Sequence, residues 1–563
     1  MSIKVKDKKL CNWSNYVTDG WAITLDTFTY EQAGYLKSWT LVSVRENLEL
    51  HGETINDLIL QLQNIKASYN LQSAPHSKDI LVIYTDNIAK LYAFMHNYGA
   101  ECDIDHYFQI LDNIEFRPCW SDDYQTATEI AIWAQFMIDT VFIPDKYFYI
   151  TPNQIPRRRM KLARKAEKNT IAADIYPHTL DAYKMLRKAY FGGILYVPYP
   201  KMIITDPIIE VDLKSAYIYC MLILKHCMSA SKKVDPINWE YYLDSTTKAS
   251  FGRYKIKYNS FTNKICCFKN ANGDKLQKGL DIVDEFCLTN IDLKLMIKNI
   301  DIQDIECIYL YEYDLDYMPK YLRDIVINEY LKKEEVKKSQ PDSEAERVQK
   351  SIVNGCYGDS CRDWQTKVEL DTARKEPNLA PQWGIWITSY CRNLLLSLGN
   401  AVDGWFYSAT DSIYCLDSED NRKKIEEFNE QIRKTTREFC EKFGYDFDKL
   451  KDLGTFCVKE HIKKFKAFGP NSYMYTKEDG KTILKASGCP KEYRAKLTEQ
   501  QIEDLYEADY IPAGERCYTF INHDKTECDI DGKHYESDGS MYEIKLTGMT
   551  ADMMSLIDLK FKN

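Results

Sequence analysis

Two aspartates, far apart in the sequence, each lie where an apolar run meets a turn. Asp212 follows Ile209 and Val211, β-branched residues that predict a buried strand with the carboxylate at its end. Asp411 lies between two apolar runs, at the predicted tip of a β-hairpin. Two such carboxylates can hold divalent cations that activate a hydroxyl nucleophile and neutralise a triphosphate. Taken singly, the first also suits a helix cap and the second an ordinary turn.

A third group of residues lies on a predicted helix between the two aspartates. Its polar members recur at i, i+3, i+7 and i+10 and therefore share one helix face; they are Arg347, Lys350, Asn354 and Tyr357. Two cations, an amide and a ring suit the phosphates and the base of a nucleoside triphosphate. Lys338 lies upstream and can add charge, and Gly358 ends the helix. A solvated helix face also explains this stripe when it is taken alone.

Three further segments suggest contact with a nucleic acid. Basic and aromatic residues alternate over 463–475, near a second basic segment at 484–491, which suits a strand that follows a phosphodiester backbone. Gly192 and Gly193, after two aromatic residues, permit close approach of the backbone to a partner strand or a nucleic acid. The basic run at 157–168 is either a solvated helix face or a linker that faces phosphates.

The elements that must position these residues alternate along the chain. Strand-like and amphipathic helical runs over 20–150 predict an α/β or α+β domain. A long insertion of strands with one helix occupies 224–325, and two charged helices follow at 321–338 and 343–357. A strand-rich region then extends to about residue 495, and a small mixed domain ends the chain.

Composition narrows the class of protein. A length of 563 residues predicts several domains with large cores. The net charge of −10 argues against wholesale nucleic-acid coating but allows local basic grooves. The 18 cysteines are scattered without a C-x-x-C pair, which indicates reduced thiols rather than a disulfide framework. Since neither a signal peptide nor an apolar span of about 18 residues is found, we expect a soluble, cytoplasmic protein.

In their order, the motifs resemble those of family B DNA polymerases, specifically the protein-primed branch of phages and linear plasmids. The similarity covers roughly residues 180–495 well and the N-terminal third only faintly. The motif D-x-x-S-x-Y matches Asp212, Ser215 and Tyr217, and K-x-x-x-N-x-x-Y-G matches Lys350, Asn354, Tyr357 and Gly358. The motif Y-x-D-T-D-S matches Tyr407, Thr410, Asp411 and Ser412, and Y-x-G-G matches Tyr190, Gly192 and Gly193. The motif K-x-Y matches Lys466, with Phe468 in place of its tyrosine.

The resemblance implies an α+β multidomain fold, a right-hand polymerase with palm, fingers and thumb behind an N-terminal RNase H-like domain of the exonuclease type. The implied domains are an exonuclease-like domain (1–188), the palm (189–223 and 383–495), an insertion associated with the priming protein (224–325), the fingers (326–361), a shortened second insertion (362–382) and the thumb (496–563).

The resemblance also implies roles for single residues. Asp212 and Asp411, with Leu213, would hold two Mg²⁺ ions, for which Mn²⁺ can substitute. The incoming nucleotide would contact Tyr217 as a steric gate against ribonucleotides, and also Lys338, Arg347, Lys350, Asn354 and Tyr357. The DNA would contact Tyr190, Gly192, Gly193, Thr410, Ser412 and Lys466. The implied partners are a DNA template–primer, deoxynucleoside triphosphates and a terminal priming protein, with a monomeric enzyme and no membrane.

The N-terminal domain departs from the family at its exonuclease motifs. Asp26 is retained, but Phe28, Leu91 and Thr128 stand where the other three carboxylates belong, while Asn87 and Tyr124 are kept. One carboxylate of four cannot hold two cations. The resemblance therefore predicts a domain without proofreading activity, kept as a scaffold or a strand guide.

The second departure is Ala409, which stands where the family has the first aspartate of Y-x-D-T-D-S. Loss of one electrostatic contributor at such a site commonly costs about 100-fold in rate. An engineered inactivating substitution and a naturally impaired protein both account for this alanine.

We therefore expect a DNA-directed DNA polymerase that transfers nucleotidyl groups to a 3′-hydroxyl or to the hydroxyl of a priming protein. The alternative is a catalytically impaired scaffold that binds nucleic acid or takes part in priming. A third hypothesis is a polymerase that makes short or relaxed-template products. Primer extension, with and without an aspartate at position 409, separates the first two.

Overall fold

The chain forms two compact units in the computed structural model. The structure describes residues 16–27, 36–46, 48–68, 80–85, 114–118, 126–141, 154–197, 200–260, 268–273, 276, 279–341, 343–358, 360, 362, 364–375, 377–486, 497–508, 510–521, 527–530, 533–536 and 541–550. The first unit comprises 1–155, 335–351 and 515–547, and the second comprises 156–334, 352–514 and 548–563.

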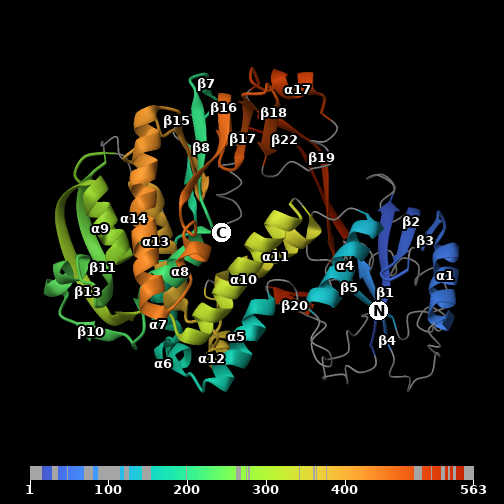
Figure 1. Cartoon of the computed structure of the whole chain (residues 1–563), viewed down its shortest axis with the longest axis horizontal. Helices are drawn as coiled ribbons and strands as arrows, with labels where there is room; N and C mark the ends of the chain where they lie inside the picture. Colours follow the sequence, from blue (N-terminus) through green and yellow to red (C-terminus); the bar gives the residue numbers. More distant parts are fainter. Residues whose placement is uncertain are drawn as a thin grey trace. The chain divides into compact units, whose positions relative to one another are not determined.

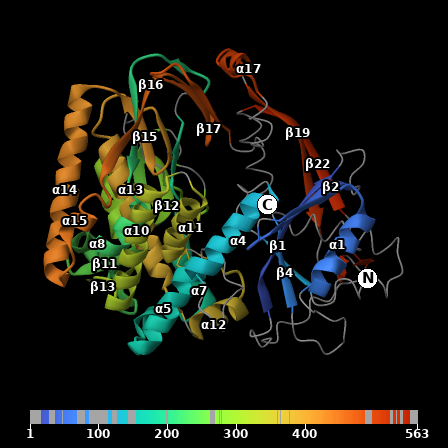
Figure 2. The ribbon, with the colours of Figure 1, turned by 45° about the vertical axis from the view of Figure 1, so that its right-hand side comes forward.

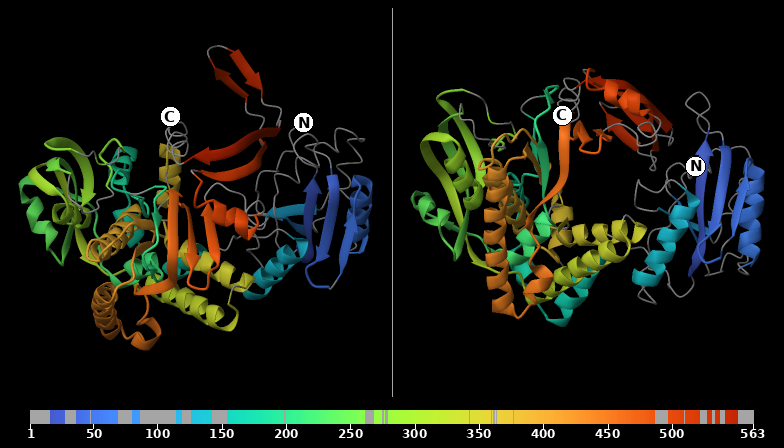
Figure 3. Two further views of the ribbon diagram at one scale, coloured as in Figure 1. Left: turned by 90° about the horizontal axis from the view of Figure 1, so that it is seen from above. Right: turned by 45° about the horizontal axis from the view of Figure 1, so that its top comes forward.

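The first unit contains a mixed sheet, called here the N-terminal sheet, with the order β3-β2-β1-β4-β5. Strands β1 to β3 pair in antiparallel fashion, whereas β4 is parallel to both β1 and β5. Buried apolar residues such as Ile23 and Val82 lie within these strands, and Figure 3 shows helices α1 and α4 on either side of the sheet. The elements are β1 (Tyr16–Thr27), β2 (Leu36–Ser43), β3 (Glu49–Gly52), α1 (Ile55–Ser68), β4 (Ile80–Thr85), β5 (Ile114–Pro118) and α4 (Ala127–Val141).

The second unit is built on an eight-stranded sheet, called here the central sheet. Its strands follow the order β18-β17-β16-β8-β15-β14-β6, and β7 pairs with β16 off this path. Helices α8, α13 and α14 pack together around a large apolar core, and Figure 1 shows α14 beside β8 and β15. The strands are β6 (Ile194–Tyr196), β7 (Ile203–Ile204), β8 (Ile208–Leu213), β14 (Tyr407–Thr410), β15 (Ser412–Leu416), β16 (Phe456–Gly469), β17 (Ser472–Lys477) and β18 (Thr482–Ala486). The helices are α8 (Ala216–Ile223), α13 (Pro381–Gly399), α14 (Glu419–Phe443) and α15 (Phe447–Leu450).

The insertion predicted at 224–325 forms a second sheet of this unit, the insertion sheet. Its order is β10-β13-β11-β12, with β9 paired to β13, and α9 packs on α13. The hydroxyl of Thr289 begins α9 by accepting the backbone N–H of Asp292. The elements are β9 (His226–Cys227), β10 (Lys232–Val234), η3 (Pro236–Leu243), β11 (Lys248–Asn259), β12 (Ile282–Thr289), α9 (Asn290–Asn299) and β13 (Asp301–Asp316).

The two predicted charged helices are present as α10 (Lys320–Ser339) and α11 (Glu344–Gly358), which are labelled in Figure 2. The basic run at 157–168 lies on α5 (Gln154–Ala166), where Arg159 bonds to the buried Glu329 of α10. Arg159 is therefore an internal contact, while both alternatives stay predictions for the rest of the run. Helices α6 (Ile171–Ile175), α7 (Leu180–Arg187), α12 (Lys367–Lys375) and α17 (Glu499–Asp504) and strands β19 (Tyr510–Ile521), β20 (Glu527–Ile530), β21 (Lys533–Glu536) and β22 (Met541–Thr550) complete the described elements.

Within the described residues, no helix has both the length and the apolar character that a bilayer span requires. The last of the strand-like runs over 20–150, at 142–150, lies outside the described residues.

Candidate active site

Neighbouring strands of the central sheet bring the two aspartates together. Asp212 is the second-last residue of β8 and lies directly opposite Ser412, the first residue of β15. The backbone N–H of Leu213 donates to the carbonyl of Asp411 at 3.0 Å, which ties the end of β8 to the hairpin turn. The predicted strand end and hairpin tip are therefore both present, and they meet.

The hairpin that carries Asp411 is held by its own backbone. Thr410 has a positive φ of 61°, and the N–H of Asp411 donates to the carbonyl of Ala409 at 2.8 Å. Ser412 is buried, and its hydroxyl donates to the same carbonyl at 3.1 Å. The hydroxyl of Ser412 thus stabilises the turn, and its contact with DNA stays a prediction.

Aromatic rings from two of the motifs stack on each other. The rings of Tyr217 on α8 and Tyr357 on α11 are 4.5 Å apart at 22°, an offset stack. Burial, followed by the neighbouring Cys391, Tyr357 and Asp411, raises the pKa of Tyr217 far above its usual value. The phenol of Tyr217 therefore stays protonated next to Asp411, and two residues predicted to line the nucleotide site lie together.

The remaining nucleotide-site residues lie on α10 and α11. Asn354 is exposed, one turn before Tyr357. Lys338, Arg347 and Lys350 are also exposed, but they belong to the first unit, so their approach to Asp212 stays a prediction.

A polar cluster that sequence reasoning missed links α10 to the segment after Asp212. The ammonium of Lys333 donates to the hydroxyl of Ser215 at 2.7 Å, and Ser215 has a positive φ of 50°. Glu334 pairs with Lys214 at 2.8 Å and with Lys333 at 3.1 Å. Burial alone would raise the pKa of Glu334, but the two lysines outweigh it and hold that pKa below its usual range. Only the abundance of charge on the predicted helix hinted at this cluster.

A second missed residue contacts Asp212 itself. The Lys459 ammonium lies 2.8 Å from Oδ2 of Asp212, and Lys459 belongs to β16, the other neighbour of β8. The sequence signal was weak, because Lys459 is one of several lysines in a basic stretch.

The segment Tyr190–Gly193 packs against the hairpin of Asp411. Strand β6 begins at Ile194 and pairs with β14, so that Ile194 lies opposite Thr410. A Cβ added at Gly193 would come within 2.7–2.8 Å of Thr410, whereas a Cβ added at Gly192 would meet nothing within 4 Å. Gly193 is therefore required by close packing, and Gly192 leaves an open backbone. The guanidinium of Arg187 lies 3.9 Å from the ring centroid of Tyr190.

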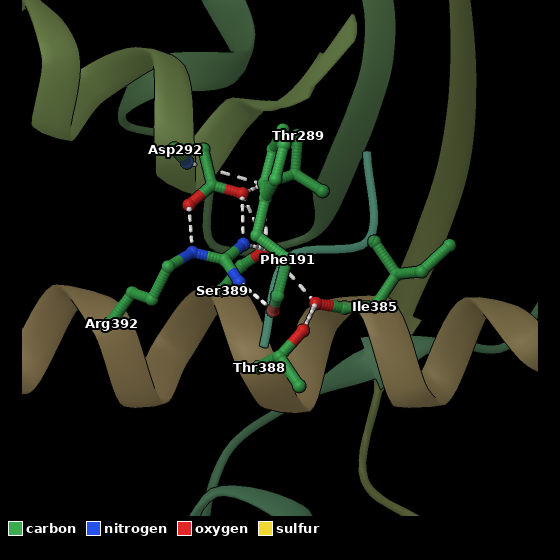
Figure 4. Close-up of polar contacts among 7 residues, drawn as sticks. All are labelled: Phe191, Thr289, Asp292, Ile385, Thr388, Ser389 and Arg392. Carbon is green, nitrogen blue, oxygen red and sulfur yellow. Dashed lines mark hydrogen bonds and ion pairs between the residues drawn. The ribbon is translucent and has the colours of Figure 1, made fainter. Parts of the chain in front are cut away.

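A buried ion pair contacts the segment Tyr190–Gly193. Arg392 on α13 pairs with Asp292 at 2.7 Å, and the two side chains are 2% and 0% exposed. Arg392 also donates to the carbonyl of Phe191, while Ser389 donates to Asp292 at 2.6 Å (Figure 4). Each charge is thus paired and hydrogen-bonded, which a buried ion pair requires in order to be tolerated. This network joins the insertion sheet, α13 and the Tyr190–Gly193 segment.

Lys466, predicted to contact the primer end, makes several hydrogen bonds within the chain. Its side chain is buried, and its ammonium donates to the carbonyls of Leu505, Tyr506 and Ala508. Phe468 is buried against Leu505 and Tyr506 as well. Because a buried ammonium must be hydrogen-bonded, Lys466 supports the segment after α17, and its contact with the primer end stays a prediction.

The exonuclease-type positions are described in part. Asp26 on β1 is exposed and pairs with Lys37 at 3.0 Å, and Thr128 is exposed on α4. Phe28, Asn87, Leu91 and Tyr124 lie outside the described residues.

The oxygen donors around Asp212 and Asp411 suit a hard divalent cation. Two carboxylates and the carbonyl of Leu213 are the kind of ligand that Mg²⁺ and Mn²⁺ accept. In the described part of the chain, however, no group of three or more acidic, histidine or cysteine side chains is close enough to share an ion. Ala409 lies on β14, opposite Ser412 of β15, and has a methyl group where an aspartate would add a third carboxylate to the cation ligands.

Comparisons with known proteins identify a matching family model. Residues 128–376 match the family model described as DNA polymerase type B, organellar and viral. No curated protein sequence matches the chain.

Solved structures of Phi29 DNA polymerase share the fold. One, complexed with primer–template DNA, has a TM-score of 0.61 at 12% identity and covers 94% of this chain and 99% of its own. Another, with primer–template DNA and incoming nucleotide substrates, has a TM-score of 0.56 at 14% identity with the same coverage. The likeness at such low identity concerns the fold. Residues 128–376 are therefore similar to the organellar and viral DNA polymerases of type B, and the chain shares the fold of the Phi29 structures.

Proposed function

We propose that the chain is a DNA-directed DNA polymerase that adds deoxynucleotides to a 3′-hydroxyl. Asp212, Asp411 and the carbonyl of Leu213 would hold two Mg²⁺ ions, for which Mn²⁺ can substitute. Bound there, the ions would activate the attacking hydroxyl and neutralise the triphosphate. The observation that carries the proposal is the hydrogen bond from Leu213 to Asp411, because it joins the two strands that bear the carboxylates.

The chain's own residues would position the nucleotide and the DNA. Tyr217, stacked on Tyr357, would face the sugar and exclude ribonucleotides sterically. Asn354 with Lys350, Arg347 and Lys338 would bind the triphosphate from the helical pair α10 and α11, the fingers of a right hand. The close packing of Gly193 on Thr410 would place the backbone of Gly192 beside the template.

Other parts of the proposal rest on family resemblance. The central sheet would be the palm, the residues from 496 onwards the thumb, and the N-terminal sheet an exonuclease-type domain of RNase H-like fold without proofreading. The insertion sheet would receive a terminal protein whose hydroxyl primes synthesis. The enzyme would act as a monomer in the cytoplasm, which for a viral protein is that of the host cell.

Primer extension tests the proposal. The purified chain is given a primer–template, deoxynucleotides and either Mg²⁺ or Mn²⁺. Ala409→Asp should raise the incorporation rate about 100-fold, because it restores a carboxylate beside the cations. Asp411→Ala in that background should abolish the gain, whereas Asp403→Ala, at an exposed residue outside the site, should not.

One other function is favoured by a specific observation. Ala409 suits a scaffold that binds nucleic acid without catalysis, and so does the fact that the described residues contain no group of three acidic, histidine or cysteine side chains that could hold a metal ion. If the Ala409→Asp protein binds primer–template but incorporates nothing with either ion, the scaffold replaces the polymerase as the best description.

A further inference from the structure

Lys459 occupies an irregular position in the central sheet. Along β16, Val458 lies opposite Val211 and Glu460 opposite Glu210, so Lys459 is an extra residue without a partner on β8. This is a β-bulge, a device that re-aims a side chain and is common next to active sites. Here the re-aimed side chain reaches the carboxylate of Asp212 at 2.8 Å.

The exposure of the two partners shows that the pair can open. The side chain of Lys459 is 51% exposed, whereas that of Asp212 is 16% exposed. An exposed ammonium loses little when it moves into water, because exposed ion pairs contribute only about 0–1 kcal/mol. The lysines of the neighbouring cluster are less exposed: Lys214 pairs with Glu334, and Lys333 bonds to Glu334 and Ser215. Lys459 is the cation of this region that can leave its partner most easily.

We infer that Lys459 is a built-in counter-cation that competes with divalent cations for Asp212. The inference rests on the proposed function, because it assigns Asp212 as a cation ligand. When a divalent ion binds, the ammonium must leave the carboxylate and remains nearby as a repelling charge. With Ala409 in place of a carboxylate, the site then has two negative side chains and one positive one. It therefore requires a higher concentration of the divalent cation than two carboxylates alone would.

Mn²⁺ binding measured without DNA or nucleotide tests this inference. Free Mn²⁺ is counted by electron paramagnetic resonance during titration of the full chain. Lys459→Met removes the charge and keeps the length of the side chain, so it should tighten Mn²⁺ binding on the order of tenfold. Lys463→Met, at an exposed lysine of the same strand, is the matched control and should leave the affinity within twofold of the parent.

The outcome is decided by a third variant. Asp212→Asn should cancel the gain made by Lys459→Met, because the competition acts through that carboxylate. An unchanged affinity in Lys459→Met, a gain that survives Asp212→Asn, or no detectable Mn²⁺ binding in Lys459→Met would each overturn the inference. Thermal unfolding of each variant verifies that it is folded.

Failure of this inference is distinguishable from failure of the proposed function. A chain whose Ala409→Asp variant extends primers, but whose Mn²⁺ affinity ignores Lys459, refutes the competition alone. A gain of Mn²⁺ affinity in Lys459→Met, without primer extension by the Ala409→Asp variant, refutes the polymerase and leaves the competition standing.

Discussion

The central sheet and the N-terminal sheet treat their acidic residues differently. Asp212 lies at the end of β8, next to a second carboxylate and a lysine delivered by a bulge. Asp26 lies on β1 with an exposed lysine as its ion-pair partner. Asp292 and Arg392 in the second unit form a buried ion pair, whereas the side chains of Asp26 and Lys37 are more than half exposed.

The two sheets differ in whether their ion pairs are buried or exposed. Buried, hydrogen-bonded charges hold a segment in one place, and the segment of Tyr190–Gly193 is held in this way. An exposed pair contributes little and constrains little. The central sheet therefore holds the segment beside its two carboxylates in place, while Asp26 in the described part of the N-terminal sheet has only an exposed ion pair.

The largest expected effect concerns the buried pair. Arg392→Met leaves the carboxylate of Asp292 buried without its cation, which should lower the free energy of unfolding by about 3–5 kcal/mol. Urea denaturation followed by circular dichroism measures this loss. Lys37→Met, which breaks the exposed pair, should cost less than about 1 kcal/mol. Equal losses in the two variants would remove the contrast between the sheets.

The stability of the second unit should depend on pH through the buried His226. Burial lowers the pKa of His226 to about 4, although hydrogen bonds to backbone carbonyls oppose this. In the unfolded chain the imidazole of His226 has its ordinary pKa of about 6.5, so below that pH the unfolded chain binds more protons than the folded chain. The free energy of unfolding therefore falls by about 3 kcal/mol between about pH 6.5 and about pH 4. Urea midpoints across this range measure the fall. His226→Gln should flatten it, and an unchanged slope would contradict the assignment.

The rate of nucleotide incorporation should respond differently to substitution of Asp411 and of Asp26. In the Ala409→Asp background, Asp411→Asn should slow incorporation at least about 100-fold, because it removes a charge that holds the cations. Asp26→Asn should change neither nucleotide incorporation nor the stability of single-stranded DNA, because one carboxylate of the four in the exonuclease motifs cannot hold two cations. Degradation of single-stranded DNA from the 3′ end that disappears in Asp26→Asn would instead show a working exonuclease in the N-terminal domain.

The smallest effect distinguishes two adjacent glycines. Gly193→Ala forces a methyl group onto Thr410 and should cost about 1–3 kcal/mol in stability. It should also weaken primer–template binding, because the shift reaches the hairpin of Asp411. Gly192→Ala meets nothing and should leave stability within about 0.5 kcal/mol. Denaturation measures the stability of the two variants, and a fluorescence-anisotropy titration measures their affinity for DNA. Equal stabilities and affinities in Gly193→Ala and Gly192→Ala would show that the packing of Gly193 on Thr410 does not matter.

Local patterns were sufficient for much of the framework. Ile209 and Val211 predicted the strand that carries Asp212, and the turn residues before Ser412 predicted the hairpin, since both signals lie within a few residues of the element. The helical face of α11 followed from spacing in the same way. The order of these motifs also indicated the family, which the family model supports.

Long-range contacts were not predictable from spacing. The sequence alone placed Asp212 and Asp411 at the end of a strand and the tip of a hairpin, because strand alternation and turn chemistry are encoded by neighbouring residues. Only the tertiary structure decided that Lys466 is buried, that Arg392 meets Asp292 and that a bulge directs Lys459 to Asp212. The reason is physical: burial, the pairing of distant charges and the register of a partner strand depend on what the rest of the chain brings alongside.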